Sequence, residues 1–359
     1  MRWQAAVVGG LLLVSGVTLW LGCGGGGGGS GTLEGVVSDG ASGGGEVADA
    51  YVYVPSTRGG RQTKLVETFT DDNGAFAIEG LPLDQELELH VEPPEGMDAV
   101  GATVPVVVPS DLQMQVQFVS LIPSGPAASV TGIAVTPSTA ELRRADTLQF
   151  DATITGPTEP LRPTWWVVGN IGRITPTGLF VAVWPGTGTV AAAIGSVSAQ
   201  VPVRVLPEPA PWAVLLIVSR PPGAAIYLDD LDTGSKTPWI FAHVPPGQHT
   251  VRAQLPDLLP GTQEVYLRAG DVAAVPFWLL PSGPTGQIYV ASTPPGAAVL
   301  LDGRTTGTQT PVLLPHVAPG AHMVALLLKG YQKESQPVMV QAGATGELSV
   351  TLQPLGAAQ

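Results

Sequence analysis

The sequence predicts an all-β protein of four small β-sandwiches in tandem, and three observations support this. Short runs of Val, Ile, Leu and Thr are broken by Pro and Gly throughout the chain, which has 35 Pro and 46 Gly in 359 residues. After residue 30 no segment places apolar residues at helical spacing over three turns. The last part of the chain repeats itself, which indicates two copies of one folding unit.

The N-terminus carries a short apolar segment that ends at the only cysteine. Arg2 precedes the uncharged run Ala5–Gly22, Cys23 follows it, and six glycines come next. A charged tip, a short apolar stretch and a small residue before the cut are typical of a secretory signal. The run is short for a membrane span. The end of this run resembles a bacterial lipoprotein signal, although Trp20 stands where that family usually has Leu.

This resemblance implies that residues 1–22 are removed, that Cys23 is acylated, and that residues 23–31 form a Gly-rich tether. Two or more acyl chains hold a protein stably on a membrane, so the expected location is the cell envelope. Within that family, Gly24 in place of Asp after the cysteine points to the outer membrane or cell surface. An uncleaved anchor, or an ordinary signal with a chance cysteine, is the alternative.

The charge of the chain is negative and unevenly spread. The formal net charge is −13, and residues 24–127 hold fifteen acidic residues against Arg58, Arg61 and Lys64. Such a surface repels nucleic acid and anionic lipid headgroups, so we expect no nucleic-acid partner. With Cys23 used for lipid, no disulfide can form within the chain, and each unit must be stable from packing alone.

Residues 32–122 are expected to form the first sandwich. Ala50–Val54 alternates as a strand does, and Asn73-Gly74 between two alternating runs predicts a hairpin. These pieces, with Gly80-Leu81-Pro82, resemble the carboxypeptidase regulatory-like domain, a transthyretin-like sandwich that itself carries no catalytic residues. Asp71 and its two neighbours lack the later acidic ligand of a calcium loop, so we interpret them as a solvated turn.

Residues 129–206 are expected to form the second sandwich, with about seven short strands. The Val-x-Pro first strand, the mid-domain Trp and the Gly188–Ala192 strand resemble bacterial Ig-like (Big-type) domains of surface proteins. Because neighbours along a strand face opposite sides, either Trp165 or Trp166 should enter the core and the other should face out. The outward ring would either stack on a sugar or pack on a neighbouring loop.

Residues 213–281 and 286–354 are expected to form two copies of one sandwich. Leu216–Pro281 aligns on Tyr289–Pro354 without a gap, 73 residues later. The shared Pro-Pro-Gly-Ala-Ala, Thr-Pro and Pro-Gly-x-His motifs resemble the PEGA domain, a small β-sandwich of bacterial envelope proteins. The glycines suit turns that need positive φ, and the prolines end strands or mark edges.

Four of the five histidines form two pairs, each around a Pro-Gly turn, namely His243 with His249 and His316 with His322. Facing rings could bind a transition metal, but a site usually needs three or four ligands. The simpler interpretation is a ring packed on a strand edge that bonds a backbone carbonyl. We find no metalloprotease, serine-hydrolase or phosphate-loop motif. We therefore expect no enzyme activity, no catalytic residues and no cofactor.

Two functions are compatible with these features. One is a structural or adhesion stalk that holds its distal repeats away from the membrane. The other is a binding protein for polysaccharide, peptidoglycan or an envelope protein, in which exposed rings contact the ligand. The candidate contacts for this second function are Trp165, Trp166, Trp239, Trp278 and Tyr331. A role as an accessory to a peptidase rests only on the family name of the first module.

Overall fold

The computed structural model describes residues 30–355 except 42–43, 59–60, 111–113 and 158. The predictions for the signal, for Cys23 and for most of the tether lie outside the described residues. Almost every described element is a strand, which confirms the all-β class. In this part of the chain no helix is long and apolar enough to span a bilayer.

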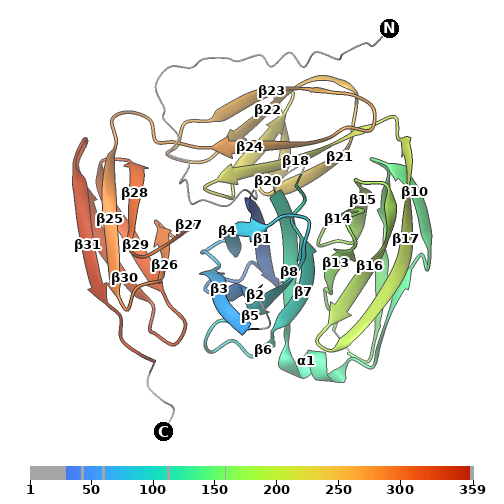
Figure 1. Ribbon diagram of the computed structural model, residues 1–359, viewed down its shortest axis with the longest axis horizontal. Coiled ribbons are helices and arrows are strands. Elements are labelled where there is room, and N and C mark those ends of the chain that lie inside the picture. Colours follow the sequence, from blue (N-terminus) through green and yellow to red (C-terminus); the bar gives the residue numbers. More distant parts are fainter. Residues whose placement is uncertain (1–29, 42–43, 59–60, 111–113, 158, 356–359) are drawn as a thin grey trace.

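The first module is a sandwich of two four-stranded sheets, with strand orders β4-β1-β8-β6 and β3-β2-β5-β7 (Figure 1). Alternate side chains of each strand point between the sheets, where Leu33, Phe76 and Leu89 are fully buried. The strands are β1 (Ser30–Asp39), β2 (Tyr51–Arg58), β3 (Arg61–Phe69), β4 (Ala75–Pro82), β5 (Glu86–Glu92), β6 (Ala99–Val100), β7 (Ala102–Val107) and β8 (Met114–Pro123).

The second module follows the short helix α1 (Ser124–Ser129). Its sheets have the orders β10-β17-β16-β13, β11-β15-β14 and β12-β9. The strands are β9 (Gly132–Thr136), β10 (Ala140–Arg144), β11 (Thr147–Gln149), β12 (Asp151–Thr155), β13 (Thr164–Val168), β14 (Gly172–Ile174), β15 (Leu179–Ala182), β16 (Gly186–Ile194) and β17 (Val197–Pro209).

The first repeat has the sheets β21-β18-β24 and β20-β19-β22-β23, and the second has β28-β25-β31 and β27-β26-β29-β30. The first repeat contains β18 (Ala213–Arg220), β19 (Ala225–Leu228), β20 (Leu231–Lys236), β21 (Trp239–Val244), β22 (Gly247–Gln254), β23 (Gly261–Leu267) and β24 (Val272–Trp278). The second contains β25 (Gly286–Thr293), β26 (Ala298–Leu301), β27 (Arg304–Gln309), β28 (Val312–Val317), β29 (Gly320–Leu327), β30 (Glu334–Val340) and β31 (Thr345–Thr351).

The first module has the same topology as the two repeats. In all three, the first strand pairs antiparallel with the fourth and parallel with the last. The second sheet is also ordered alike, with the second strand between the third and the fifth. The chain therefore holds three copies of one strand order, of which the sequence revealed only the two that still share residues.

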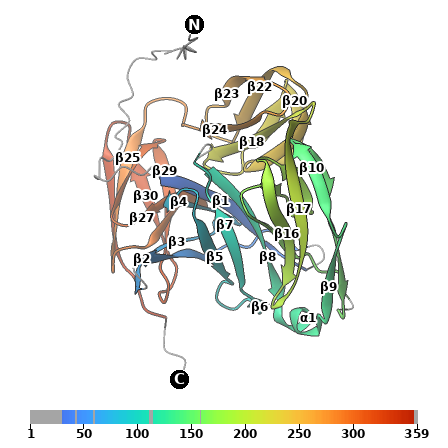
Figure 2. The same cartoon turned by 45° about the vertical axis from the view of Figure 1, so that its right-hand side comes forward.

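The modules pack around the first one and do not extend away from the N-terminus as a string (Figures 1 and 2). Val116 and Phe118 on β8 share one buried apolar cluster with Leu216 and Ile240 of the first repeat and Val181 of the second module. Between the second module and the first repeat, β17 continues to Pro209 and pairs there with β10.

The two repeats differ in what covers their three-stranded sheets. Leu216 and Ile240, on the outer face in the first repeat, are 3% and 6% exposed. Their counterparts 73 residues later, Tyr289 and Leu313, are 41% and 48% exposed. Every residue from Ala213 to Ser219 is buried, whereas the matching part of β25 alternates. The first repeat is therefore buried on both faces of this sheet, and the second is open on one.

Polar contacts and a small apolar cluster hold the second repeat on the first module. In the cluster, Phe69 packs against Leu300, Ala325 and Leu327. The Asp71 carboxylate accepts the Thr305 N–H at 3.1 Å, and the Asp72 N–H donates to the Gly303 carbonyl at 3.0 Å. Lys333 pairs with Asp49 at 2.7 Å. The expectation that the Asp71 turn is solvated is therefore wrong for Asp71, which is fully buried. Burial raises the pKa of Asp71, although its bonds from backbone N–H groups oppose the shift.

We predict opposite tolerance at the matched positions 216 and 289. Leu216→Ala should lower the free energy of unfolding by about 2–5 kcal/mol, because it empties a packed junction. Tyr289→Ala should change it by less than about 1 kcal/mol, because this side chain is half exposed. Guanidinium unfolding followed by tryptophan fluorescence measures both. Equal losses at the two positions would show that the first repeat is not buried in this way.

Candidate functional site

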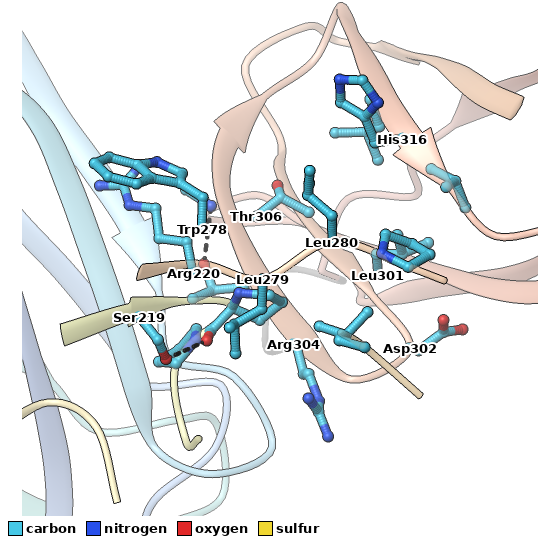
Figure 3. A pocket seen from close by; sticks show the side chains of 18 of the residues that line it. Ser219, Arg220, Trp278, Leu279, Leu280, Leu301, Asp302, Arg304, Thr306 and His316 are labelled. Carbon is cyan, nitrogen blue, oxygen red and sulfur yellow. Dashed lines mark hydrogen bonds between the residues drawn. The ribbon is translucent and has the colours of Figure 1, made fainter. Parts of the chain in front are cut away.

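A cleft of about 620 Å³ lies where the first module and both repeats meet (Figure 3). Phe76 and Ala77 of β4 contribute from the first module. Leucines and prolines near strand ends contribute much of the two repeat walls, because most strands of these sandwiches end in a Pro- or Gly-containing turn. Typical wall residues are Pro221, Pro256, Leu279, Leu301, Leu314 and Pro315.

The mouth of the cleft carries large apolar side chains that are exposed to solvent. Trp278 at the end of β24 is 68% exposed, and Leu280 just after it is 46% exposed. Leu313 on β28 lines the same cleft from the second repeat. Exposed apolar side chains that gather around a concave surface mark a site for a ligand or partner.

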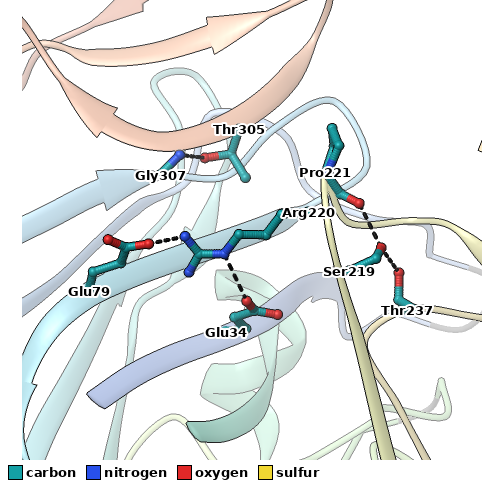
Figure 4. A network of polar contacts seen from close by, with 8 residues as sticks. All are labelled: Glu34, Glu79, Ser219, Arg220, Pro221, Thr237, Thr305 and Gly307. Carbon is teal, nitrogen blue, oxygen red and sulfur yellow. Dashed lines mark hydrogen bonds and ion pairs between the residues drawn. The ribbon is translucent and has the colours of Figure 1, made fainter. Parts of the chain in front are cut away.

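Arg220, at the end of β18, forms an ion-pair group at the base of the cleft (Figure 4). Its guanidinium lies 3.5 Å from Glu34 Oε1 and also pairs with Glu79. Glu34 is 4% exposed, and its Oε2 has no hydrogen-bond partner among the described residues. Burial raises the pKa of the Glu34 carboxyl, and Arg220 only partly opposes that shift.

Most other polar groups on the walls are already bonded inside their own repeat. Ser219 Oγ donates to the Pro221 carbonyl at 2.6 Å. Thr306 Oγ1 donates to the Val299 carbonyl at 2.7 Å. Asp302 binds His322 Nδ1 at 2.7 Å and accepts the Met323 N–H at 2.9 Å. Among the described residues, the polar wall side chains without such a bond include Asp257, Arg304 and His316.

The two histidines of each pair have separate partners. His249 Nδ1 lies 2.7 Å from Asp229 Oδ2, and its Nε2 lies 2.7 Å from the Pro245 carbonyl. His322 repeats both contacts with Asp302 and the Ala318 carbonyl at the same distances. The backbone carbonyl was anticipated from the sequence. The carboxylate was missed, because Asp229 and Asp302 lie 20 residues away at the head of a turn.

The other histidine of each pair has φ +58°, a left-handed conformation that is unusual for a side chain of this size. His243 Nε2 lies 3.0 Å from Thr147 Oγ1 of the second module. His316, at the matching position, lines the cleft. Among the residues that the structure describes, no group of three or more His, Cys, Asp or Glu is placed to hold a metal ion.

The candidate ligand-contact rings are distributed differently from the expectation. Trp165 and Trp166 lie on opposite faces of β13 as predicted, but both are buried, so neither is an exposed ring that stacks on a sugar. Trp165 packs inside the second module, and Trp166 packs on the core of the first. Trp239 and Tyr331 are half-buried against the cores of their repeats. Of the five, only Trp278 is largely exposed, and it lies at the cleft.

The family model for the PEGA domain matches residues 212–279 and 285–355, so the two repeats are PEGA domains. The resemblances of residues 32–122 and 129–206 stay predictions. No curated protein matches the chain.

Solved structures of other β proteins are similar at a low level. The TIE protein of Bacillus anthracis has 10% identity and a TM-score of 0.20, and the match covers 90% of this chain and 75% of that one. The minor pilin GBS52 of Streptococcus agalactiae has 10% identity and a TM-score of 0.19, covering 41% and 98%. The major pilin subunit BcpA of Bacillus cereus has 11% identity and a TM-score of 0.19, covering 69% and 98%. Scores this low carry no argument about function.

We predict that His249 stabilises the fold most at low pH. Burial lowers its pKa, but the bonds to Asp229 and to the Pro245 carbonyl outweigh this and raise the pKa above the usual 6.5. Both ring nitrogens face acceptors, so only the doubly protonated ring satisfies both. The stabilisation should be full below about pH 6.5 and lost as the pH rises through the raised folded-state pKa.

NMR titration of the His249 ring measures this pKa directly. In Asp229→Asn the pKa should fall, because the neutral amide no longer favours the imidazolium. Denaturation midpoints between pH 5.5 and pH 8.5 should show a pH-dependent loss in the parent chain that is absent from His249→Gln. A ring that titrates at or below the usual pKa would contradict the prediction.

Proposed function

We propose that this chain is a non-catalytic cell-envelope protein, held on a membrane by acyl groups on Cys23. Its modules form one compact platform that presents the cleft between the two PEGA domains. The observation that carries this proposal is the buried apolar cluster shared by the first module, the second module and the first repeat. A cluster of this kind favours one packed body over an extended stalk, because each module covers apolar surface of its neighbours.

The arrangement of acidic and basic groups supports a non-catalytic role. Catalysis needs an acid, base or nucleophile held at a shared site and free to act on a substrate. At the cleft, Glu34 is held by Arg220 and Asp302 is held by His322. These pairs fix neighbouring segments to each other. Asp257 and His316 also line the cleft, and among the described residues no hydrogen bond or ion pair joins them.

Binding of a polysaccharide, peptidoglycan or envelope protein is the second candidate function, and one observation favours it. The Trp278 ring is exposed at the mouth of the cleft, where it could stack on a ligand. A role as an accessory to a peptidase has no support beyond the resemblance of the first module.

The anchor is tested by labelling cells that make the protein with an alkyne analogue of palmitate. The parent chain should incorporate the label and fractionate with membranes, whereas Cys23→Ser should not be labelled. Because Cys23 is the only cysteine, no second thiol can accept the label. An unlabelled parent chain would remove the anchor from the proposal.

The platform is tested by small-angle X-ray scattering of a chain of residues 24–359, which keeps every described contact. A single compact body of this length has a radius of gyration of about 20 Å. We expect a value close to this. A much larger radius of gyration with an elongated distance distribution would contradict the compact platform and favour an extended stalk.

A further inference from the structure

The chemistry of the cleft walls restricts the class of ligand that fits. A sugar or a peptide backbone loses many hydrogen bonds to water on binding and must find replacements on the protein. Here Ser219, Thr306 and Asp302 already bond within their own repeats. A hydrocarbon chain has no hydrogen bonds to replace and gains free energy from every apolar group that it buries.

Two charged side chains that line the cleft form no ion pair among the described residues, the cation Arg304 and the anion Asp257. Arg304, at the start of β27, lines the cleft and is half-buried. Within the described part of the chain it forms no ion pair, whereas Arg220 pairs with Glu34 and Glu79. Figure 3 shows Arg304 and His316 on opposite sides of the cluster of leucines, with Leu280 and Leu301 between them. The cleft thus combines an apolar middle with a cation at one side.

We propose that the cleft binds a long-chain fatty acid, with the hydrocarbon between the two PEGA domains and the carboxylate at Arg304. The volume of about 620 Å³ lies in the range of small-molecule sites, about 300–1,000 Å³. The exposed side chains at the mouth, Trp278, Leu280 and Leu313, cover the part of the chain that leaves the cleft. The ligand is the free fatty acid and not an acyl group of the protein. This inference rests on the proposed function only in that an envelope protein would meet the fatty acid at the membrane.

Chain length provides the first test. Residues 24–359 are titrated with decanoate, dodecanoate and tetradecanoate below their micelle concentrations, with calorimetry as the readout. Each added CH₂ should tighten binding about fourfold, which corresponds to about 0.8 kcal/mol per buried CH₂. Affinity that does not change with chain length would overturn the proposal, as would tighter binding of oligosaccharides or of apolar hexapeptides.

Point variants locate the site. Leu280→Asp and Leu313→Asp place a charge in the apolar mouth and should weaken dodecanoate binding at least about tenfold. The matched controls are Tyr266→Asp and Met339→Asp, which are 70% and 64% exposed and lie outside the cleft. These controls should bind as the parent does. Equal binding by all four variants would place the ligand elsewhere.

Arg304→Gln tests the head group. It should weaken dodecanoate about tenfold, as expected for a lost charge-assisted contact, and leave dodecanol unchanged. An equal effect on the acid and the alcohol would refute the role of Arg304.

The acylated full-length protein separates this inference from the proposed anchor. It should bind dodecanoate as residues 24–359 do. If the acyl groups of Cys23 filled the cleft instead, only the shorter chain would bind, and the free acid would be excluded as the ligand. Failure of the labelling experiment on Cys23 would leave binding by residues 24–359 unaffected, so the two proposals fail independently.

Discussion

The arrangement of the whole molecule depends on one apolar junction on the outer face of β8. Phe118 and Val116 cannot face water without cost, since each buried side chain of this size contributes about 1.5–3 kcal/mol. The three-stranded sheet of the first repeat covers them with Leu216 and Ile240. Once this sheet is docked, Arg220 at the end of β18 reaches Glu34 and Glu79, and the base of the cleft is set.

The interior of each sandwich could be predicted from the sequence, because alternation and turn residues are local signals. The PEGA repeats were identified and their family is confirmed. The contacts between modules were not predicted, although a signal exists. Ala213–Ser219 is almost entirely apolar where the matching strand alternates, and a strand buried on both faces reads in this way. The contact between modules was indicated by positions at which the two repeats differ, whereas the alignment of the repeats recorded only the positions at which they are identical.

Two further features of the structure, the shared topology and the His249–Asp229 contact, could not be predicted from residue patterns. The topology shared by the first module and the repeats is not carried by common residues, because turns and apolar alternation can be met by many sequences. The His249–Asp229 contact joins residues from β22 and the β19–β20 turn. Its partner could be named only once the register of β22 on β19 was known. The cleft likewise depends on how three modules meet.

The two copies of the repeat have diverged to fit different neighbours. The first has apolar side chains on the outer face of its sheet and joins two other modules. The second has a half-open sheet and contacts the first module through Asp71, Asp72 and Lys333 and through the cluster around Phe69. A gene rearrangement that removed or exchanged the first copy would leave Phe118 uncovered and expose an apolar surface to solvent. The first copy thus cannot be exchanged for the second at this point of the chain, because Tyr289 and Leu313 stand where the junction needs Leu216 and Ile240.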